Sequence, residues 1–221
     1  MTKDEIKEII KSKKLIAILR NIGEEKLFPI VEALYQGGIR VLEVTYSQNG
    51  TISDDDTEKN IHNLVEKMSN KMLIGAGTVL TEEQVKRTKR AGGCFIISPD
   101  TNENVINKTN ELEMVSIPGA LTPTEIKHAY DLGADFVKIF PSSAFGTSYI
   151  KAIKAPLSNI DLLSVGGVDL NNINDFYNAG VCGFGIGSNI LDKKMIENND
   201  YEGLKELAKK YVSEVGKLKW K

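Results

Sequence analysis

The sequence predicts an α/β protein with the (β/α)8 TIM-barrel fold and an extra helix at its N-terminal end. Eight short apolar runs alternate with amphipathic stretches along the 221 residues, which is the pattern of parallel strands joined by helices. The alternation continues through the whole chain, without a linker or a low-complexity segment. The glycine pattern of dinucleotide-binding open sheets is missing from the sequence, which favours a closed barrel. We therefore expect residues 1–221 to form one barrel domain.

The expected strands are rich in Val, Ile or Phe, and most of them end in Gly, Pro or a small polar residue. Such punctuated apolar runs are typical of buried strands. The eight runs are Leu15–Arg20, Arg40–Tyr46, Met72–Gly77, Cys94–Pro99, Met114–Gly119, Asp135–Pro141, Asp161–Gly167 and Val181–Ser188.

Amphipathic stretches between the runs predict the outer helices. Thr81 with Gln84 three residues later indicates a capping box at one helix start. Pro123 after Thr122 suits the first position of another helix, where its missing N–H is not needed. Three stretches end at glycines, which readily adopt the left-handed conformation found after a helix. These stretches are Glu24–Gln36, Thr81–Ala91 and Thr122–Leu132.

Three further segments complete the expected architecture. Met1–Ser12 precedes the first strand and is predicted to form the extra helix over the bottom of the barrel. Ser47–Asn60 is polar and is predicted to be the longest loop. The helix that contains Phe176 is expected to begin at a cap provided by Asp169 or Asn171, and the sequence does not choose between these two residues.

The composition excludes several classes of protein. Lys and Arg number 28 and Asp and Glu number 30, which gives a formal net charge of −2, whereas nucleic-acid-binding domains usually have a basic excess. The apolar runs are far too short to cross a bilayer, and the acidic start does not fit a signal peptide. Two cysteines in apolar surroundings do not make a disulfide framework. We expect a cytoplasmic protein that binds neither nucleic acid nor a membrane.

Lys138 is the first candidate for chemistry. In the run Asp135–Pro141, Phe136, Lys138 and Phe140 share one side, and the apolar residues between them share the other, helix-facing side. This alternation places Lys138 inside the barrel. A buried lysine tends to lose its proton, and a neutral amine in a pocket is a Schiff-base nucleophile. The alternative is a buried salt bridge without chemistry.

Glu43 is expected to be a second charged residue inside the same barrel. Val41, Glu43 and Thr45 share one face of their strand, and Leu42 and Val44 share the other. A carboxylate beside a neutral amine is able to move protons. The alternative is an ion pair, either with Lys138 of the sixth run or with Arg20 at the end of the first run.

Arg20 and three small residues suggest where an anionic substrate binds. Arg20 has the parity of Ile18 and is expected at the mouth, where its planar fork suits a carboxylate or a phosphate; the alternative is a rim charge. Gly166, Gly167 and Ser188 end the seventh and eighth runs, the place where phosphate-binding barrels hold the phosphate. Glycines there also serve chain turns, and that alternative stays open.

Other polar residues do not form a predicted metal or cofactor site. His62 and His128 stand alone on expected helices without zinc-ligand spacing. The acidic run Asp54–Asp56 lies in the expected polar loop and is interpreted as solvated. Cys94 and Cys182 lack a basic neighbour or a nearby histidine and are interpreted as buried filler. We expect no metal and no organic cofactor.

Taken together, the motifs resemble the KDPG/KHG aldolase family. These class I enzymes cleave 2-keto-3-deoxy-6-phosphogluconate or 4-hydroxy-2-oxoglutarate to pyruvate and an aldehyde. Each motif alone is weak, but their order at successive strand ends is highly specific. The motifs are VLEVT (Val41–Thr45), GAGTV (Gly75–Val79), ISP (Ile97–Pro99), the IPG and TPTE run (Ile117–Glu125), FVKIFP (Phe136–Pro141), GGV (Gly166–Val168) and GxGS (Gly185–Ser188).

The resemblance implies a role for each matching residue. Lys138 matches the Schiff-base lysine, and Glu43 matches the general acid/base. Thr78 and Pro99 match residues of the pyruvate pocket, and Phe140 matches the aromatic wall beside the lysine. The family also implies a small keto-acid substrate and a homotrimer. The residues that match the phosphate end are Gly166, Gly167 and Ser188.

The sequence departs from the family pattern in three places. Some members have an arginine just after VLEVT that holds the substrate carboxylate, whereas Thr45, Tyr46 and Ser47 stand there in this chain; Arg20 is the candidate replacement. Val165 precedes the Gly-Gly pair where many members have threonine. The expected polar loop is also longer. These departures concern the ends of the substrate and not the imine chemistry.

Two other functions use parts of the same pattern. A phosphate-binding barrel isomerase or transferase needs the glycine and serine site but no imine, with Lys138 as an electrostatic clamp. A non-catalytic sugar-acid-binding barrel keeps the pocket without turnover. Reaction with pyruvate and borohydride separates both from an aldolase, because only a Schiff-base enzyme gains a reduced adduct on one lysine.

Overall fold

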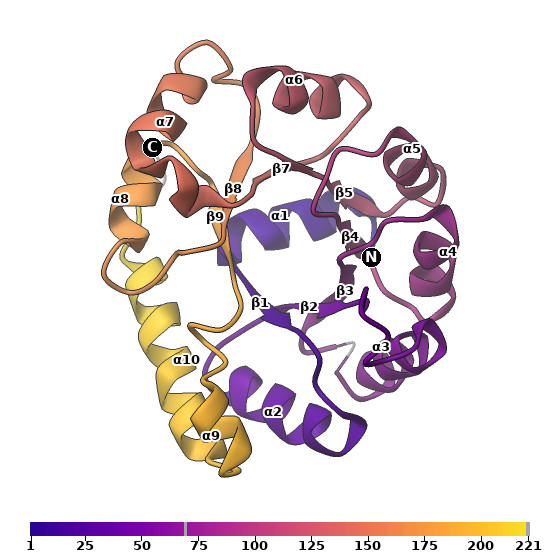
Figure 1. The fold of residues 1–221 in the computed structure, drawn as a ribbon. Helices are drawn as coiled ribbons and strands as arrows, with labels where there is room; N and C mark the ends of the chain where they lie inside the picture. Colours follow the sequence, from indigo (N-terminus) through magenta and orange to yellow (C-terminus); the bar gives the residue numbers. More distant parts are fainter. Residues whose placement is uncertain (69, 220–221) are drawn as a thin grey trace.

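The computed structural model describes residues 1–68 and 70–219, and it has one parallel sheet closed into a ring with helices outside it (Figure 1). The strands are β1 Leu15–Leu19, β2 Val41–Thr45, β3 Leu73–Gly77, β4 Phe95–Ile97, β5 Val115–Ile117, β6 Gly119–Ala120, β7 Val137–Ile139, β8 Leu162–Val165 and β9 Gly183–Ile186. The helices are α1 Lys3–Lys13, α2 Glu24–Gln36, α3 Asp54–Met68, α4 Glu82–Arg90, α5 Glu103–Glu111, α6 Pro123–Asp131, the 3-10 helix η1 Ser142–Ala144, α7 Gly146–Lys154, α8 Ile173–Asn178, α9 Lys193–Glu197 and α10 Tyr201–Gly216.

The ring closes through a single divided strand. The strand order is β5-β4-β3-β2-β1-β9-β8-β7-β6, and Pro118 is the residue that separates β5 from β6. β5 pairs with β4, and β6 pairs with β7. The carbonyl of Pro118 accepts a hydrogen bond from the Lys138 amide at 2.8 Å. Since β5 and β6 together are the fifth barrel strand, the predicted (β/α)8 barrel is confirmed.

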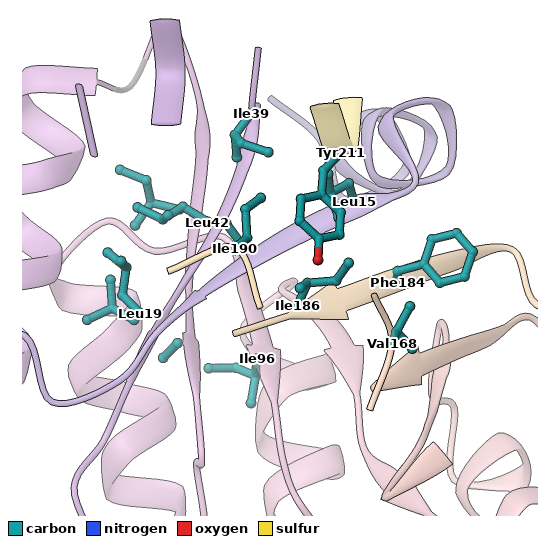
Figure 2. Packing of buried hydrophobic residues seen from close by; sticks show 14 of the residues in the cluster. Leu15, Leu19, Ile39, Leu42, Ile96, Val168, Phe184, Ile186, Ile190 and Tyr211 are labelled. Atoms are coloured by element: carbon teal, nitrogen blue, oxygen red, sulfur yellow. The ribbon is translucent and has the colours of Figure 1, made fainter. Parts of the chain in front are cut away.

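Two apolar clusters lie on the two sides of this sheet. The inner cluster contains alternate strand residues such as Val41, Phe95 and Phe136. The outer cluster contains the intervening residues, such as Leu42 and Val137, together with the helix faces that cover them. Figure 2 shows part of the outer cluster between strands and helices. This alternation of faces sets which side chains reach the barrel interior.

The predicted N-terminal helix α1 fills one end of the barrel. Figure 1, seen along the barrel axis, shows α1 crossing the centre of the ring. Ile6 and Ile10 of α1 belong to the inner apolar cluster. Lys3 forms an ion pair with Asp135, just before β7, at 2.8 Å. Because Asp135 lies at the start of β7, α1 covers the amino ends of the strands and leaves the carboxyl ends free.

Two local predictions were wrong. Residues 47–60 are not one long loop, because α3 begins at Asp54. Asp54–Asp56 form its first turn, where negative charge is stabilised by the helix dipole. The cap of α8 is Asn172, and neither Asp169 nor Asn171. The side chain of Asp169 instead accepts backbone hydrogen bonds from both of the residues that precede the helix.

The predicted helix boundaries at α4 and α6 are confirmed. Thr81 accepts a hydrogen bond from the Gln84 amide, and Thr122 with Glu125 forms a complete capping box. At the start of α4, the side-chain oxygen of Gln84 accepts a hydrogen bond from the amide of Leu80. A capping box would use the amide of Thr81, one residue later. No helix among the described residues is long and apolar enough to cross a membrane.

Candidate active site

Strand alternation brings Glu43 of β2 and Lys138 of β7 to the barrel interior. Each lies two residues after a member of the inner cluster, which is Val41 for Glu43 and Phe136 for Lys138. Glu43 is only 1% exposed and Lys138 only 5%. The inward orientation predicted from the sequence is therefore confirmed for both side chains.

The Lys138 amine is buried beside an aromatic ring. Its Nζ atom is 4.6 Å from the centre of the Phe140 ring, so the expected aromatic wall stands beside it. Within residues 1–68 and 70–219, no ion pair closer than 4.0 Å and no side-chain hydrogen bond engages Lys138. A tight salt bridge to Glu43, which was the alternative to chemistry, is therefore not formed.

Glu43 is held in a space that a glycine leaves open. Its Oε2 atom is buried without a hydrogen-bond partner. A Cβ atom on Gly77 of the neighbouring strand would lie 1.6 Å from Oε1. Gly77 therefore belongs to the site, although the sequence analysis includes it only as part of the GAGTV motif. The pairing of Thr45 with Gly77 would have indicated its role, but that pairing is known only when the register of β2 and β3 is known.

Burial shifts the pKa values of Lys138 and Glu43 in opposite directions. Loss of solvent lowers the pKa of Lys138; Glu43 and Asp100 oppose that shift and Arg20 adds to it. Loss of solvent raises the pKa of Glu43, and the positive charges of Lys138 and Arg20 oppose the rise. Both groups are therefore pushed toward their neutral forms. A neutral amine is nucleophilic, and a carboxylate with a raised pKa is a stronger base than an ordinary one.

Arg20 and Thr78 meet at the mouth, above the buried pair. Arg20 Nη2 donates a hydrogen bond to Thr78 Oγ1 at 3.5 Å. Gln48 Nε2 donates to the carbonyl of Thr78 at 3.3 Å. Thr78 has a backbone φ of +55°, which is rare for a β-branched residue. Sequence reasoning missed Gln48, because no motif marks the residues that follow the second strand.

Pro99 is half-buried at the end of β4, beside the divided fifth strand. A Cβ atom on Gly119 would lie 2.3 Å from the Pro99 carbonyl oxygen. This close backbone approach connects the ends of the fourth and fifth strands at the mouth, and β4 is paired with β3, the strand that Thr78 follows. Phe140 is 37% exposed and borders the same opening.

The predicted anion-binding glycines have the conformation that favours glycine. Gly166 has φ of +90° and Gly167 has φ of +78°. A Cβ atom on Gly167 would lie 2.3 Å from the Cβ of Ser143, and the Ser143 amide donates to the Gly166 carbonyl at 3.1 Å. Steric need alone explains these glycines, so their geometry is compatible with both the phosphate and the turn interpretation.

Ser188 lies at the mouth but borders a different space. It is exposed after β9 and lines a cavity of about 500 Å³ that Arg20 also lines. Apolar side chains of Ile22, Leu191 and Ile196 form other parts of its wall. Among the residues that the structure describes, no group of three or more His, Cys, Asp or Glu is arranged to hold a metal ion.

Comparison with known proteins identifies the family. A model of the KDPG and KHG aldolase family matches residues 6–207. The chain belongs to the KDPG and KHG aldolase family. The predicted resemblance is thereby confirmed, and the protein is a class I aldolase.

Individual relatives extend this result to most of the chain. The family member 2-dehydro-3-deoxy-6-phosphogalactonate aldolase of Escherichia coli (strain K12) is 40% identical over 177 residues, 80% of this chain and 83% of that one. A solved structure described as "Native KDPGal structure" is 36% identical, with a TM-score of 0.80 over 91% of this chain and 96% of that one. The KDPG aldolase of Legionella pneumophila, with pyruvate captured at low pH as a covalent carbinolamine intermediate, is 28% identical. Its TM-score is 0.81 over 92% of this chain and 96% of that one.

Proposed function

We propose that Lys138 is the Schiff-base nucleophile of this aldolase and that Glu43 is its general acid/base. The observation that supports this most is the Lys138 amine, which is buried, lies over the Phe140 ring and has no ion-pair partner among the described residues. Burial favours its neutral form, which is the form that attacks a carbonyl. Glu43 is the buried carboxylate on the same interior face, and its raised pKa suits proton transfer.

The reaction then proceeds in four steps. The Lys138 nitrogen adds to the keto carbon, and the resulting carbinolamine loses water to give a protonated imine. Glu43 takes the proton of the C4 hydroxyl while the C3–C4 bond breaks. The bonding electrons move into the enamine of pyruvate, and the aldehyde is released. The proton returns to C3, water adds to the imine carbon, and pyruvate leaves with the regenerated amine.

We propose a 2-keto-3-deoxy-6-phospho sugar acid as the substrate, with the galactonate compound first among the candidates. The name 2-dehydro-3-deoxy-6-phosphogalactonate aldolase belongs to relatives that are 40% and 37% identical, whereas relatives named for the gluconate compound are 28% to 32% identical. Both sugar acids share the keto-acid end and differ in configuration at C4. 4-Hydroxy-2-oxoglutarate, which lacks a phosphate, is the third candidate.

The remaining site residues divide between the two ends of the substrate. Arg20, Thr78 and Pro99 are proposed to bind the keto-acid end, beside the Phe140 ring. The hydrogen bond between Arg20 and Thr78 supports this grouping. The phosphate is proposed to bind at the carboxyl ends of β8 and β9, with the backbone amides that glycine leaves accessible. Its residues are Gly166, Gly167 and Ser188.

Two broader expectations remain proposals. A homotrimer is implied by the family, and the exposed Phe145, whose ring lies 4.9 Å from that of Tyr149, is an apolar surface available for contact between subunits. Light scattering of the purified protein measures this state directly. We also propose the cytoplasm as its compartment, which cell fractionation tests.

Trapping with pyruvate and borohydride tests the assignment of the nucleophile. The expected result is one reduced adduct, on Lys138, and neither labelling nor cleavage in Lys138→Ala. An isomerase or transferase without an imine would give no adduct. A sugar-acid-binding protein would show a higher melting temperature with ligand but no turnover. Labels spread over several lysines, or normal turnover by the alanine variant, would contradict the proposal.

A further inference from the structure

Thr78 has a backbone conformation that its side chain disfavours. Its φ of +55° lies in the left-handed region, where a β-branched residue is a genuine outlier. Such residues persist only where the surrounding structure holds them, and they gather at ligand-binding sites. Thr78 directly follows Gly77, the glycine that makes room for Glu43. The groups that hold Thr78 therefore bear on the site itself.

Two side chains from neighbouring loops contact Thr78 on different atoms. Gln48, in the segment between β2 and α3, donates from Nε2 to its carbonyl at 3.3 Å. Arg20, directly after β1, donates from Nη2 to its hydroxyl at 3.5 Å. β1, β2 and β3 are consecutive in the sheet, so the three residues meet along one side of the mouth. The carbonyl contact fixes the peptide plane, and the hydroxyl contact fixes the side chain.

We propose that Gln48 is a positioning residue that holds Thr78 in this conformation for the carboxylate of the keto acid. This inference rests on the proposed function. Gln48 lies outside the family motifs found in the sequence. Thr45, Tyr46 and Ser47 provide no arginine after the second strand. In this chain a neutral amide holds the backbone of Thr78, and the remaining guanidinium N–H groups of Arg20 are left for the substrate.

The direct test replaces the amide donor without changing side-chain length. Gln48→Met removes the hydrogen bond to Thr78, whereas Gln36→Met is the matched control. Gln36 donates to Glu32 at the last residue of α2, toward the amino ends of the strands. The readout is the pyruvate concentration that gives half-maximal borohydride labelling of Lys138. We expect Gln48→Met to raise this concentration about three- to tenfold, the usual effect of one lost hydrogen bond.

Two further measurements separate positioning from general damage to the fold. At saturating substrate, the kcat of Gln48→Met should stay within about twofold of the wild-type value, because the lost interaction acts on binding. Gln48→Arg restores a donor of sufficient length and should recover most of the pyruvate affinity. Equal loss in Gln48→Met and Gln36→Met, or a loss confined to kcat, would overturn the proposal.

A double-mutant cycle tests whether Gln48 acts through Thr78. Thr78→Gly adopts the left-handed conformation without strain, so it no longer needs the amide to hold it. In that background, Gln48→Met should change pyruvate affinity by less than about twofold. If the effect of Gln48→Met is the same in both backgrounds, Gln48 contacts the substrate itself and the positioning role is wrong.

The design also separates this inference from the proposed function. If the wild-type protein gives no adduct on Lys138, the assignment of the Schiff-base lysine fails. If the adduct forms in the wild type and in Gln48→Met with equal pyruvate dependence, the aldolase chemistry stands and only the role of Gln48 is refuted.

Discussion

A Cβ atom on residue 77 would lie 1.6 Å from the Oε1 atom of Glu43, so the carboxylate occupies the volume that Gly77 leaves empty. Gly77 is paired with Thr45, two residues beyond Glu43 on the adjacent strand. The Glu43 carboxylate is therefore positioned by the lack of a side chain on Gly77 as much as by its own strand. In a close-packed interior, a single added methyl group must displace something.

Gly77→Ala tests this relationship. The methyl group should push Glu43 out of place and lower kcat about 10²-fold or more, the contribution of a general acid–base group. Adduct formation on Lys138 should continue, because the amine is on the opposite strand. Gly216→Ala is the matched control, since nothing lies within 4 Å of its Cβ position. Steady-state kinetics and mass spectrometry of the trapped adduct provide the two readouts.

The pH dependence should follow the shifted pKa values of both groups. Burial lowers the pKa of Lys138 from 10.5, so adduct formation should rise with a midpoint below pH 10.5. Burial raises the pKa of Glu43 from 4.5, so the acid limb of kcat/KM should lie above pH 4.5. Glu43→Gln should remove that acid limb and lower kcat about 10²- to 10⁴-fold. A rising midpoint at 10.5 would mean that the lysine is not desolvated.

The buried pair should lower the stability of the fold. A lysine with a lowered pKa costs free energy at every pH below 10.5, and a carboxylate with a raised pKa costs free energy at every pH above 4.5. Both penalties act at pH 7. Replacing the pair by the apolar residues of Lys138→Met with Glu43→Leu should therefore stabilise the protein by about 1–4 kcal/mol. Melting curves at pH 7 measure the change, about 2–4 °C for each kcal/mol.

A surface pair provides the control for that experiment. Lys127 and Asp131 are both about half exposed and lie one turn apart on α6. Lys127→Met with Asp131→Asn should change stability by no more than about 0.5 kcal/mol. A buried double variant that melts below the wild type would show that the pair stabilises the barrel.

Substrate comparison tests the phosphate end. The values of kcat/KM for the two 6-phospho sugar acids should exceed that for 4-hydroxy-2-oxoglutarate by a modest factor, because backbone amides provide most of the binding. Ser188→Asp places a negative charge beside the proposed site and should lower kcat/KM only for the phosphorylated substrates. A ratio near one, or equal damage to all three substrates, would place the anion site elsewhere.

Strand alternation was sufficient to predict the inward side chains. Around Lys138 the residues that alternate with Val137 and Ile139 are charged or aromatic, and around Glu43 the residues that alternate with Leu42 and Val44 include the charged one. Alternate strand residues of a barrel face its interior and its helices, so these patterns predict which side chains point inward. The glycine that accommodates Glu43 could not be predicted in the same way. Its role depends on which residues of β2 and β3 lie side by side, and that register is a long-range property.

Loop boundaries were predicted less well for a different reason. Asp54–Asp56 is polar enough to resemble loop sequence, yet the same three carboxylates stabilise the first turn of α3. The division of the fifth strand at Pro118 is decided by pairing with two different neighbours. The contacts of Thr78 with Arg20 and Gln48 join three loops that are separate in the sequence. A local sequence pattern does not predict such long-range contacts.

The helix α1 has a consequence for the order of events in catalysis. Ile6 and Ile10 fill the end of the barrel behind Lys138, and Lys11 is bound to Asp161 at 2.6 Å beneath β8. Because α1 fills that end, we expect substrate and products to enter and leave through the opening at the carboxyl ends of the strands. On the proposed mechanism, we expect the aldehyde fragment to lie nearer this opening than the carbon bound to Lys138 and therefore to leave first. Pyruvate should then leave through the same opening, after water has reached the imine carbon.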